Sequence, residues 1–393
     1  MKTVSVKPSP GALTRRAFGA LVLGSACDRA LPPIVRPSAS AIRPADPPAS
    51  PRATVCAGLP RAPLGSYPTP VERSSTLGAR LGIASLWIKR DDHSALPYGG
   101  GKVRKLEFFL GDALRLGKTS VATFGGVGSN HALATALYAR RSGLGAVLFL
   151  VPEPRSDEVR RHLLIEAAAG ADLRLGSVRS EEDPGLGAAL AALPDRGEGT
   201  YVIPRGGSSP LGNVGFFAAA FELAEQVERG DMPHPDVVYV PMGTMGTVVG
   251  LALGVVAAGL RTRVAAVRAS NPGTSSRQRL DAMLEETADF LRRCDTRPDV
   301  AEARARIRIV ADQLGDGYGR PTRSGEEAIA IAHDDAGLSL EPTYTAKALA
   351  ALVADAPALR DQTVLFWNTH NGHPLPPPAA VPADLPEGLR PYV

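Results

Sequence analysis

Short apolar runs alternate with longer stretches of helical spacing along most of the chain, between about residues 64 and 370. The apolar or β-branched runs predict strands at Leu86–Lys89, Val121–Phe124, Ala146–Val151, Tyr201–Ile203, Val237–Val240, Val264–Val267 and Val364–Trp367. The Ala/Leu-rich stretches predict helices at Val103–Leu116, Asn130–Ser142, Asp157–Ala169, Asn213–Arg229, Gly246–Ala258, Ser276–Arg292, Gly325–Ala336 and Ala346–Ala354. This alternation is typical of an α/β protein built on parallel sheets.

Parallel sheets bind ligands beyond the carboxyl ends of their strands, so the loops that follow strands carry the functional information. In the first such loop, glycines at 99–101 lead into a helix that begins with Lys102. Glycines let the backbone approach a ligand closely, and a lysine at the positive end of a helix is held where its charged form is disfavoured. An uncharged amine is what bond formation with an aldehyde requires. The plainer interpretation is that Lys102 and Lys105 are solvated helix residues.

Two further loops predict polar contacts with a ligand. The glycine-rich loop 125–131 contains Ser129 and Asn130, either of which would cap the next helix and could also face a ligand there. The loop 242–247 contains Gly243, Thr244, Met245, Gly246 and Thr247 before an apolar helix. Backbone N–H groups, hydroxyls and a helix N-terminus together form an anion site that suits a phosphate. No Gly-Lys-Ser/Thr follows, so this is not a P-loop.

Charge and cysteine content exclude several classes of protein. The formal net charge is +4, but four basic residues and no acidic one lie within residues 1–27. Without these four, 40 basic residues balance 40 acidic ones, and no nucleic-acid partner is expected. The three cysteines are too few and too far apart for a zinc site or a disulfide framework. No apolar run approaches the roughly 18 residues of a spanning helix, which excludes an integral membrane protein.

The first 27 residues are typical of an export signal. Arg15-Arg16, followed by Phe18, a short apolar run and small residues, resembles a twin-arginine signal peptide. Cys27 would be the lipidated residue of a lipoprotein, or cleavage follows Ala26; we therefore expect an exported protein, in the periplasm or cell envelope. The alternative is a chance arginine pair on a cytoplasmic protein. Residues 28–63 form a proline-rich linker, and residues 374–393 a proline-rich tail that wraps the surface or is disordered.

Several patches resemble one family in the same order. They are Tyr67-Pro68-Thr69-Pro70-Val71, Leu86 to Asp92, Gly99 to Glu107, Phe124 to His131, Pro204-Arg205-Gly206-Gly207-Ser208, Gly317-Tyr318-Gly319 and Glu341-Pro342-Thr343-Tyr344-Thr345. Over residues 64 to 373, the chain resembles the 1-aminocyclopropane-1-carboxylate deaminase / D-cysteine desulfhydrase family. This resemblance implies a pyridoxal-phosphate enzyme with the tryptophan synthase β-like fold (fold type II), a homodimer, and two α/β domains with the cofactor between them. Residues 64–107 and 213–373 would form the larger domain and 108–212 the smaller, inserted one.

The resemblance also implies a role for each matching residue. Lys102 would bond covalently to the aldehyde of pyridoxal phosphate, Asn130 would bind the ring hydroxyl, and Ser129 would contact the substrate carboxylate or transfer a proton. The loop 243–247 would bind the phosphate. Tyr318 and Tyr344 would be the two active-site tyrosines.

The residue after the second tyrosine favours one activity. The deaminases carry a glutamate there, which pairs with the pyridine nitrogen, whereas this chain has Thr345, as the desulfhydrases tend to have. A carboxylate strengthens the electron sink, which the opening of a cyclopropane ring needs more than the loss of a thiolate does. We therefore expect a lyase of small amino acids that releases pyruvate, ammonia and sulfide from D-cysteine. The alternatives are a deaminase that forms 2-oxobutyrate and a catalytically silent binding lipoprotein.

Three positions depart from the family. Gly101 replaces an asparagine, Gly128 replaces a glutamine, and Asn368 to His373 replace a His-Thr-Gly-Gly motif. Thr369 or Asn371 could therefore meet the pyridine nitrogen in place of Thr345. His370 and His373 are three residues apart with no third ligand nearby, so no metal site is expected. A dinucleotide-binding oxidoreductase is disfavoured because the Gly-x-Gly-x-x-Gly fingerprint is missing.

Overall fold

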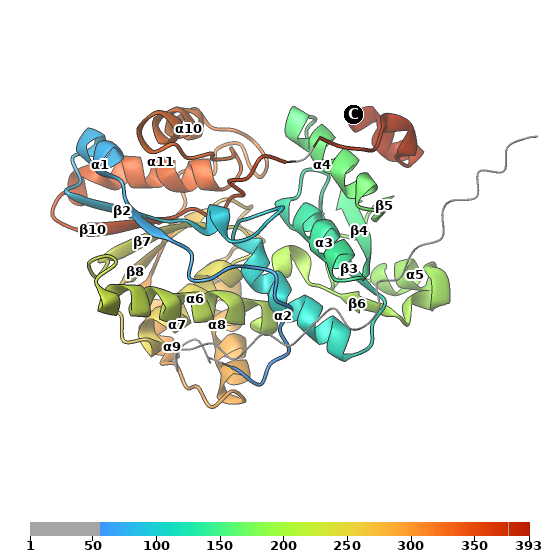
Figure 1. Cartoon of the computed structure of the whole chain (residues 1–393), viewed down its shortest axis with the longest axis horizontal. Helices are drawn as coiled ribbons and strands as arrows, with labels where there is room; N and C mark the ends of the chain where they lie inside the picture. The colour runs from blue at the N-terminus through green and yellow to red at the C-terminus, as the bar shows by residue number, and fades with distance from the viewer. Residues whose placement is uncertain (1–55, 376) are drawn as a thin grey trace, which may run out of the picture. The chain divides into compact units, whose positions relative to one another are not determined.

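The computed structural model describes residues 56–375 and 377–393, which contain two β-sheets (Figure 1). The larger sheet has the strand order β1-β2-β10-β7-β8-β9. Its strands are β1 (Val71–Arg73), β2 (Ser85–Lys89), β10 (Thr363–Trp367), β7 (Val237–Met242), β8 (Arg263–Arg268) and β9 (Ile307–Val310). All neighbours pair in parallel except β1, which runs antiparallel to β2. The predicted signal peptide and most of the predicted linker lie outside the described residues.

Both faces of this sheet are covered by helices, which explains why its central strands are continuously apolar. Val238 and Val240 of β7 pack into the same cluster as the helices on one face, while Val237 and Tyr239 pack against those on the other. The first face carries α6 (Pro210–Arg229), α7 (Gly246–Ala257), α8 (Arg277–Arg292) and α9 (Val300–Arg306). The second carries α1 (Ser75–Leu81), α10 (Arg323–Ala336) and α11 (Thr345–Asp355).

The smaller sheet has the order β5-β4-β3-β6 and is parallel throughout. Its strands are β5 (Asp172–Leu175), β4 (Gly145–Val151), β3 (Ser120–Gly126) and β6 (Thr200–Val202). One face packs with α2 (Lys102–Arg115), α3 (Asn130–Arg141) and α4 (Asp157–Ala168), and α5 (Leu186–Ala191) lies against the other. All four strands fall within residues 108–212. Helix α2 also packs on α6 and so connects the two sheets.

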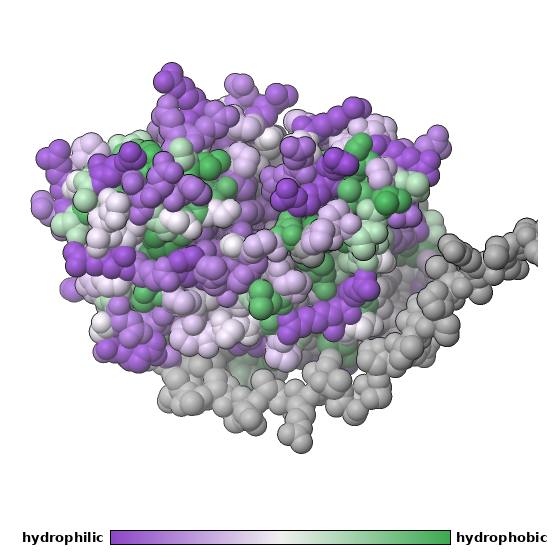
Figure 2. Space-filling model, turned by 45° about the horizontal axis from the view of Figure 1, so that its top comes forward, coloured by the Kyte–Doolittle hydropathy of each residue, from purple (hydrophilic) through white to green (hydrophobic). Residues whose placement is uncertain are grey.

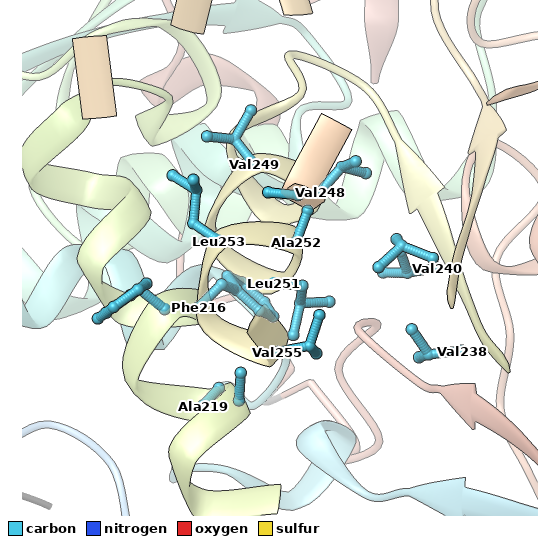
Figure 3. Packing of buried hydrophobic residues seen from close by; sticks show 14 of the residues in the cluster. Phe216, Ala219, Val238, Val240, Val248, Val249, Leu251, Ala252, Leu253 and Val255 are labelled. Carbon is cyan, nitrogen blue, oxygen red and sulfur yellow. The ribbon is translucent and has the colours of Figure 1, made fainter. Parts of the chain in front are cut away.

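Glycines allow α6 and α7 to pack closely. Figure 3 shows Phe216 and Ala219 of α6 beside the apolar side chains of α7, with Val238 and Val240 of β7 nearby. A Cβ atom at Gly250 of α7 would lie 2.4 Å from the Asn213 backbone oxygen and 2.8 Å from Phe216 Cβ. Because backbone atoms cannot yield as a flexible side chain can, this contact fixes the distance between the helices.

We therefore expect Gly250→Ala to lower the free energy of unfolding by about 1–3 kcal/mol through overpacking. Gly187 is the matched control, since it lies in α5 and a Cβ there would meet nothing within 4 Å. Gly187→Ala should instead stabilise the protein by up to about 1 kcal/mol, because alanine loses less backbone entropy in a helix. Denaturant unfolding of both variants tests this, and equal effects at the two sites would contradict it.

Parts of the predicted linker and tail belong to the folded structure. Cys56 and Ala62 are buried, and the Ala62 N–H donates to the backbone oxygen of Glu107 in α2 at 2.8 Å. The expectation that the linker extends to residue 63 without packing is therefore wrong at its end. In the tail, Leu385 and Leu389 are buried in the core of the smaller sheet, and the C-terminal segment lies beside α4 (Figure 1). These apolar side chains hold the tail on the surface.

A membrane span needs a helix of sufficient length and apolarity. None of the helices in residues 56–375 and 377–393 is long and apolar enough to cross a bilayer. On the face drawn in Figure 2, apolar residues form small groups separated by polar ones.

Candidate active site

A pocket of about 260 Å³ lies at the carboxyl ends of both sheets. It is formed by the start of α2 and by the loops that follow β3, β4, β6, β7, β8 and β10, as expected for parallel sheets. The predicted site residues line it, apart from the alternative Asn371. They are Lys102, Ser129, Asn130, Gly243, Thr244, Met245, Gly246, Thr247, Tyr318, Tyr344, Thr345 and Thr369.

Lys102 is the first residue of α2, and its amine lies inside the pocket. Its Nζ donates to the Gly206 oxygen at 3.5 Å. Burial lowers the pKa of Lys102 to about 8, and the nearby Glu341 carboxylate opposes this shift only in part. The sequence predicted a shift caused by the positive end of the helix, whereas in the structure burial lowers the pKa. A fraction of the amine is therefore uncharged at neutral pH.

Four groups form a cradle for an anion beside Lys102. The Lys105 Nζ donates to the Ser208 Oγ at 3.1 Å, and this hydroxyl lies 2.6 Å from Thr244 Oγ1 and accepts the Gly246 N–H at 3.2 Å. A Cβ at Gly246 would lie 2.8 Å from the Lys105 Nζ, so a side chain there would fill the cradle. Amine, hydroxyls and a backbone N–H at a helix start suit a phosphate.

Two of these groups, Lys105 and Ser208, were not predicted to bind an anion. Lys105 is buried rather than solvated, because it lies one turn after Lys102 and so shares its face of α2. This spacing was the signal that could have identified it. Ser208 lies in the loop after β6, and nothing in the sequence places that loop beside Thr244.

Ser129 caps a helix, as the sequence predicted, and its position in the pocket leaves its predicted contact with a ligand open. It is the N-cap of α3, where its Oγ accepts the Ala132 N–H at 3.2 Å, and it also lines the pocket. Asn130 follows it and accepts a hydrogen bond from the Tyr98 hydroxyl on Oδ1 at 2.7 Å. Among the described residues, Asn130 Nδ2 has no partner, so it is free to donate to a ligand.

The two tyrosines come from separate segments and meet in the pocket. The Tyr344 hydroxyl donates to the Tyr318 hydroxyl at 2.9 Å, and the two rings pack edge to face. Burial raises the pKa of both tyrosines. Both hydroxyls are therefore protonated at neutral pH, and the pair holds a proton that can be donated into the pocket.

The loop after β10 places one of two predicted alternatives in the pocket. Asn371 Oδ1 accepts the Gly99 N–H at 2.7 Å and its Nδ2 donates to the His373 oxygen at 2.6 Å, so its amide stabilises the loop outside the pocket lining. Thr369 lines the pocket. Thr345 does too, but its Oγ1 donates to Glu341 Oε1 at 3.2 Å and accepts the Glu341 N–H at 3.1 Å. Of these two threonine hydroxyls, that of Thr369 is the one without a hydrogen-bond partner among the described residues, so it is free for a ligand.

Several further titratable side chains line the pocket that were not predicted as site residues, and two of them, Glu153 and His370, have an unpartnered polar atom among the described residues. Glu153 fills the space beside Gly128, whose N–H donates to its Oε2 at 3.1 Å, and its Oε1 has no partner within the described part of the chain. His370 is the other, with a buried and unpartnered Nδ1 in the same part of the structure. Burial lowers the pKa of His370, so its ring is neutral near pH 7.

The histidine pair 370 and 373 does not gather further ligands. The His373 ring packs edge to face on His93, with 5.0 Å between ring centroids. Within residues 56–375 and 377–393, no three His, Cys, Asp or Glu residues are grouped as metal ligands.

Comparison with known proteins identifies the family. A family model described as "Pyridoxal-phosphate dependent enzyme" matches residues 63–370. A protein named nocardicin C-9' epimerase, from Nocardia uniformis subsp. tsuyamanensis, is 35% identical over 79% of this chain and 92% of its own length. D-cysteine desulfhydrase of Serratia proteamaculans is 31% identical over 80% and 94%, respectively.

A solved structure supports the same assignment and confirms the expected fold class. It is described as an ACC deaminase homologue, is 29% identical, and superposes with a TM-score of 0.71 over 88% of this chain and all of its own. The family match covers more than half of the chain, and the pocket supplies the amine and the anion cradle that the cofactor requires. The chain therefore belongs to the pyridoxal-phosphate dependent enzymes.

Proposed function

We propose that this enzyme is a lyase that removes the β-substituent of a small amino acid, with D-cysteine as the first candidate and pyruvate, ammonia and sulfide as products. The named relatives support this class of reaction, since one is a D-cysteine desulfhydrase. The observation that carries the proposal is the neutral Thr345 in the pocket lining. No carboxylate occupies its position, and the nearby Glu341 carboxylate accepts the backbone N–H groups of residues 343–345.

The pocket residues fit pyridoxal phosphate. Lys102 would bond to its aldehyde, since the amine is partly uncharged at neutral pH. The cradle of Lys105, Ser208 and Thr244, with the loop 243–247, would hold the phosphate. Asn130 would bind the ring hydroxyl through Nδ2, and Thr369 would meet the pyridine nitrogen with its free hydroxyl.

Bound pyridoxal phosphate supplies an electron sink that accepts the electron pair left by the α-proton of the substrate. In this mechanism, the Lys102 amine takes the α-proton, with Ser129 close by to orient the substrate carboxylate through its hydroxyl. The tyrosine pair donates a proton to the departing β-substituent, because burial keeps both hydroxyls protonated. Because residue 345 is neutral, the electron sink of the cofactor would be weak. A weak electron sink suffices for a good leaving group such as a thiolate.

A product screen tests the proposal. The purified holoenzyme is incubated with D- and L-cysteine, D- and L-serine, and 1-aminocyclopropane-1-carboxylate, and pyruvate, 2-oxobutyrate and sulfide are measured. Pyruvate and sulfide from cysteine support the proposal. Formation of 2-oxobutyrate from the cyclopropane substrate alone would replace it with the deaminase alternative. Bound cofactor without turnover of any amino acid would favour the catalytically silent binding protein.

Epimerisation at the α-carbon is a second candidate function. It is favoured by the 35% identical relative named an epimerase and by the pocket, which offers the Ser129 hydroxyl for proton transfer in addition to the Lys102 amine. Incubation in deuterium oxide separates the two reactions. An epimerase would exchange the α-proton and produce the opposite enantiomer without forming a keto acid.

The lowered pKa of Lys102 predicts how the apoprotein takes up pyridoxal phosphate. With a pKa of about 8, the uncharged fraction of the amine rises about fivefold from pH 7 to 8, then less than twofold to pH 9, and levels off. We expect the uptake rate, followed by absorbance, to have this shape. Lys102→Ala is the control for reaction at other amines. A rate that keeps rising tenfold per pH unit to pH 10 would show an ordinary lysine pKa.

Export and dimer formation are further parts of the proposal. The twin-arginine pattern and Cys27 support an exported enzyme, lipid-anchored or cleaved after Ala26, and the family resemblance supports a homodimer. Fractionation of cells and the mass of the mature N-terminus test whether the enzyme is exported. A change of Arg15-Arg16 to Lys-Lys should retain the protein in the cytoplasm. Light scattering of the purified holoenzyme tests whether it is a homodimer.

A further inference from the structure

Two arginines line the pocket without an acidic partner for their side chains among the described residues. Arg205 is half-buried in the loop after β6, and Arg179 is exposed in the loop after β5. Their backbone N–H groups donate to Glu181 and Asp183. In the part of the chain that the structure describes, neither guanidinium makes a hydrogen bond or an ion pair.

The position of Arg205 is set by its neighbours. The two residues after it, Gly206 and Gly207, have positive φ angles of 66° and 63°. Any residue with a side chain would be strained in this backbone conformation. The Gly206 oxygen accepts from the amines of Lys102 and Lys105, so Arg205 lies next to the residue that touches the reactive amine. Its charge also acts on Tyr344, where it partly opposes the burial that raises the tyrosine pKa.

No other charge in the pocket balances Arg205. The acidic residues of the lining are Glu153 and Glu341. Glu341 is engaged by the backbone at the start of α11, and Glu153 by the N–H of Gly128. Lys105 belongs to the phosphate cradle. A partly buried guanidinium without a counter-charge is costly, and its planar donors match a carboxylate.

We propose that Arg205, with Arg179 at the rim, binds a second negatively charged group at the far end of the substrate side chain. This inference rests on the proposed function and narrows its substrate class to amino acids whose β-substituent ends in a carboxylate or a similar anion. Arg205 is then a specificity-determining residue. Arg179 contributes less, because water and salt screen an exposed charge.

Matched pairs of ligands test the proposal. S-carboxymethylcysteine and S-carbamoylmethylcysteine differ only in a carboxylate and an amide, and pyruvate release reports their turnover. Glutamate and glutamine differ in the same way but have no β-leaving group, so their binding, read from the absorbance of the bound cofactor, is independent of elimination. Both enantiomers of each are used. We expect the holoenzyme to prefer the carboxylate of each pair by about 10–100-fold.

Arg205→Gln should reduce this preference at least tenfold, Arg205→Lys should retain part of it, and Arg160→Gln on the exposed side of α4 should not change it. The holoenzyme could prefer glutamate over glutamine in a way that depends on Arg205, yet eliminate none of the compounds. That result would support this inference and contradict the proposed lyase reaction. Equal turnover and equal binding of the carboxylate and the amide of each pair by the wild-type holoenzyme would overturn the inference. Loss of cofactor on dialysis of Arg205→Gln, with the preference intact, would also overturn it and assign the arginine to the phosphate.

Discussion

Replacing Lys102 by alanine should abolish the reaction and remove the absorbance band of the holoenzyme near the visible edge. We expect kcat to fall by roughly 10⁴-fold or more, because one residue both bonds to the cofactor and accepts the α-proton. The pocket gives a reason for this dependence on one amine. Lys105, the other lysine in the lining, is held by Ser208 and the Gly206 oxygen and belongs to the anion cradle.

Lys118→Ala is the matched control, since this lysine lies after α2 and its amine donates to the Glu198 backbone oxygen, away from the pocket. It should retain wild-type activity. Reduction of the holoenzyme with borohydride, followed by peptide mass spectrometry, locates the cofactor directly. A pyridoxyl label on a side chain other than Lys102 would contradict the assigned roles, as would an undiminished band in Lys102→Ala.

Replacing Glu222 by glutamine should destabilise the protein by about 3–5 kcal/mol, because it removes one partner from a buried network of charges. Glu222 bonds to Lys89 at 2.6 Å and to Arg104 at 2.8 Å, and Arg104 also forms two hydrogen bonds with Asp91. The Lys89 side chain is 0% exposed and the Arg104 side chain 4%. Without Glu222, two buried cations would share one carboxylate.

The pH dependence of this effect has a defined sign. Burial alone would raise the pKa of Glu222, but Arg104 and Lys89 outweigh it and lower the pKa from 4.5 to about 2. The stability from this charge is therefore complete above about pH 4.5, and is lost as the pH falls towards 2. Urea unfolding of wild type and Glu222→Gln should show a constant difference from pH 5 to 8 that shrinks below 4.5.

Asp231→Asn provides the control, because its partner Arg229 is 50% exposed and Asp231 is 39% exposed. This surface pair should contribute at most about 1 kcal/mol. A similar small effect at Glu222 would show that the network is not the constraint we describe. The network matters for the site because Arg104 lies in the first turn of α2, two residues after Lys102. It fixes the part of the helix that carries the reactive amine.

The buried strands were predictable because both of their faces lie against helices, so their sequences are continuously apolar, as in Val237 to Val240. Strands β1, β5 and β9 were missed. Each is at the edge of its sheet and has three or four residues, and polar side chains such as Glu72 and Asp172 interrupt the apolar pattern. Pairing with one neighbour stabilises these strands, and that pairing has no local signal.

The sequence by itself identified the fold class, the family resemblance and the post-strand loops that form the pocket, because these follow from local patterns and from the common direction of parallel strands. Tertiary structure alone decided which side chains share the pocket. It placed Ser208 beside Thr244, Glu153 beside Gly128 and His370 in the lining. Within the described part of the chain, it left the Arg205 side chain without an acidic partner. It also assigned the lowered pKa of Lys102 mainly to burial. Burial and charge balance depend on residues far apart in the chain, so no local pattern records them.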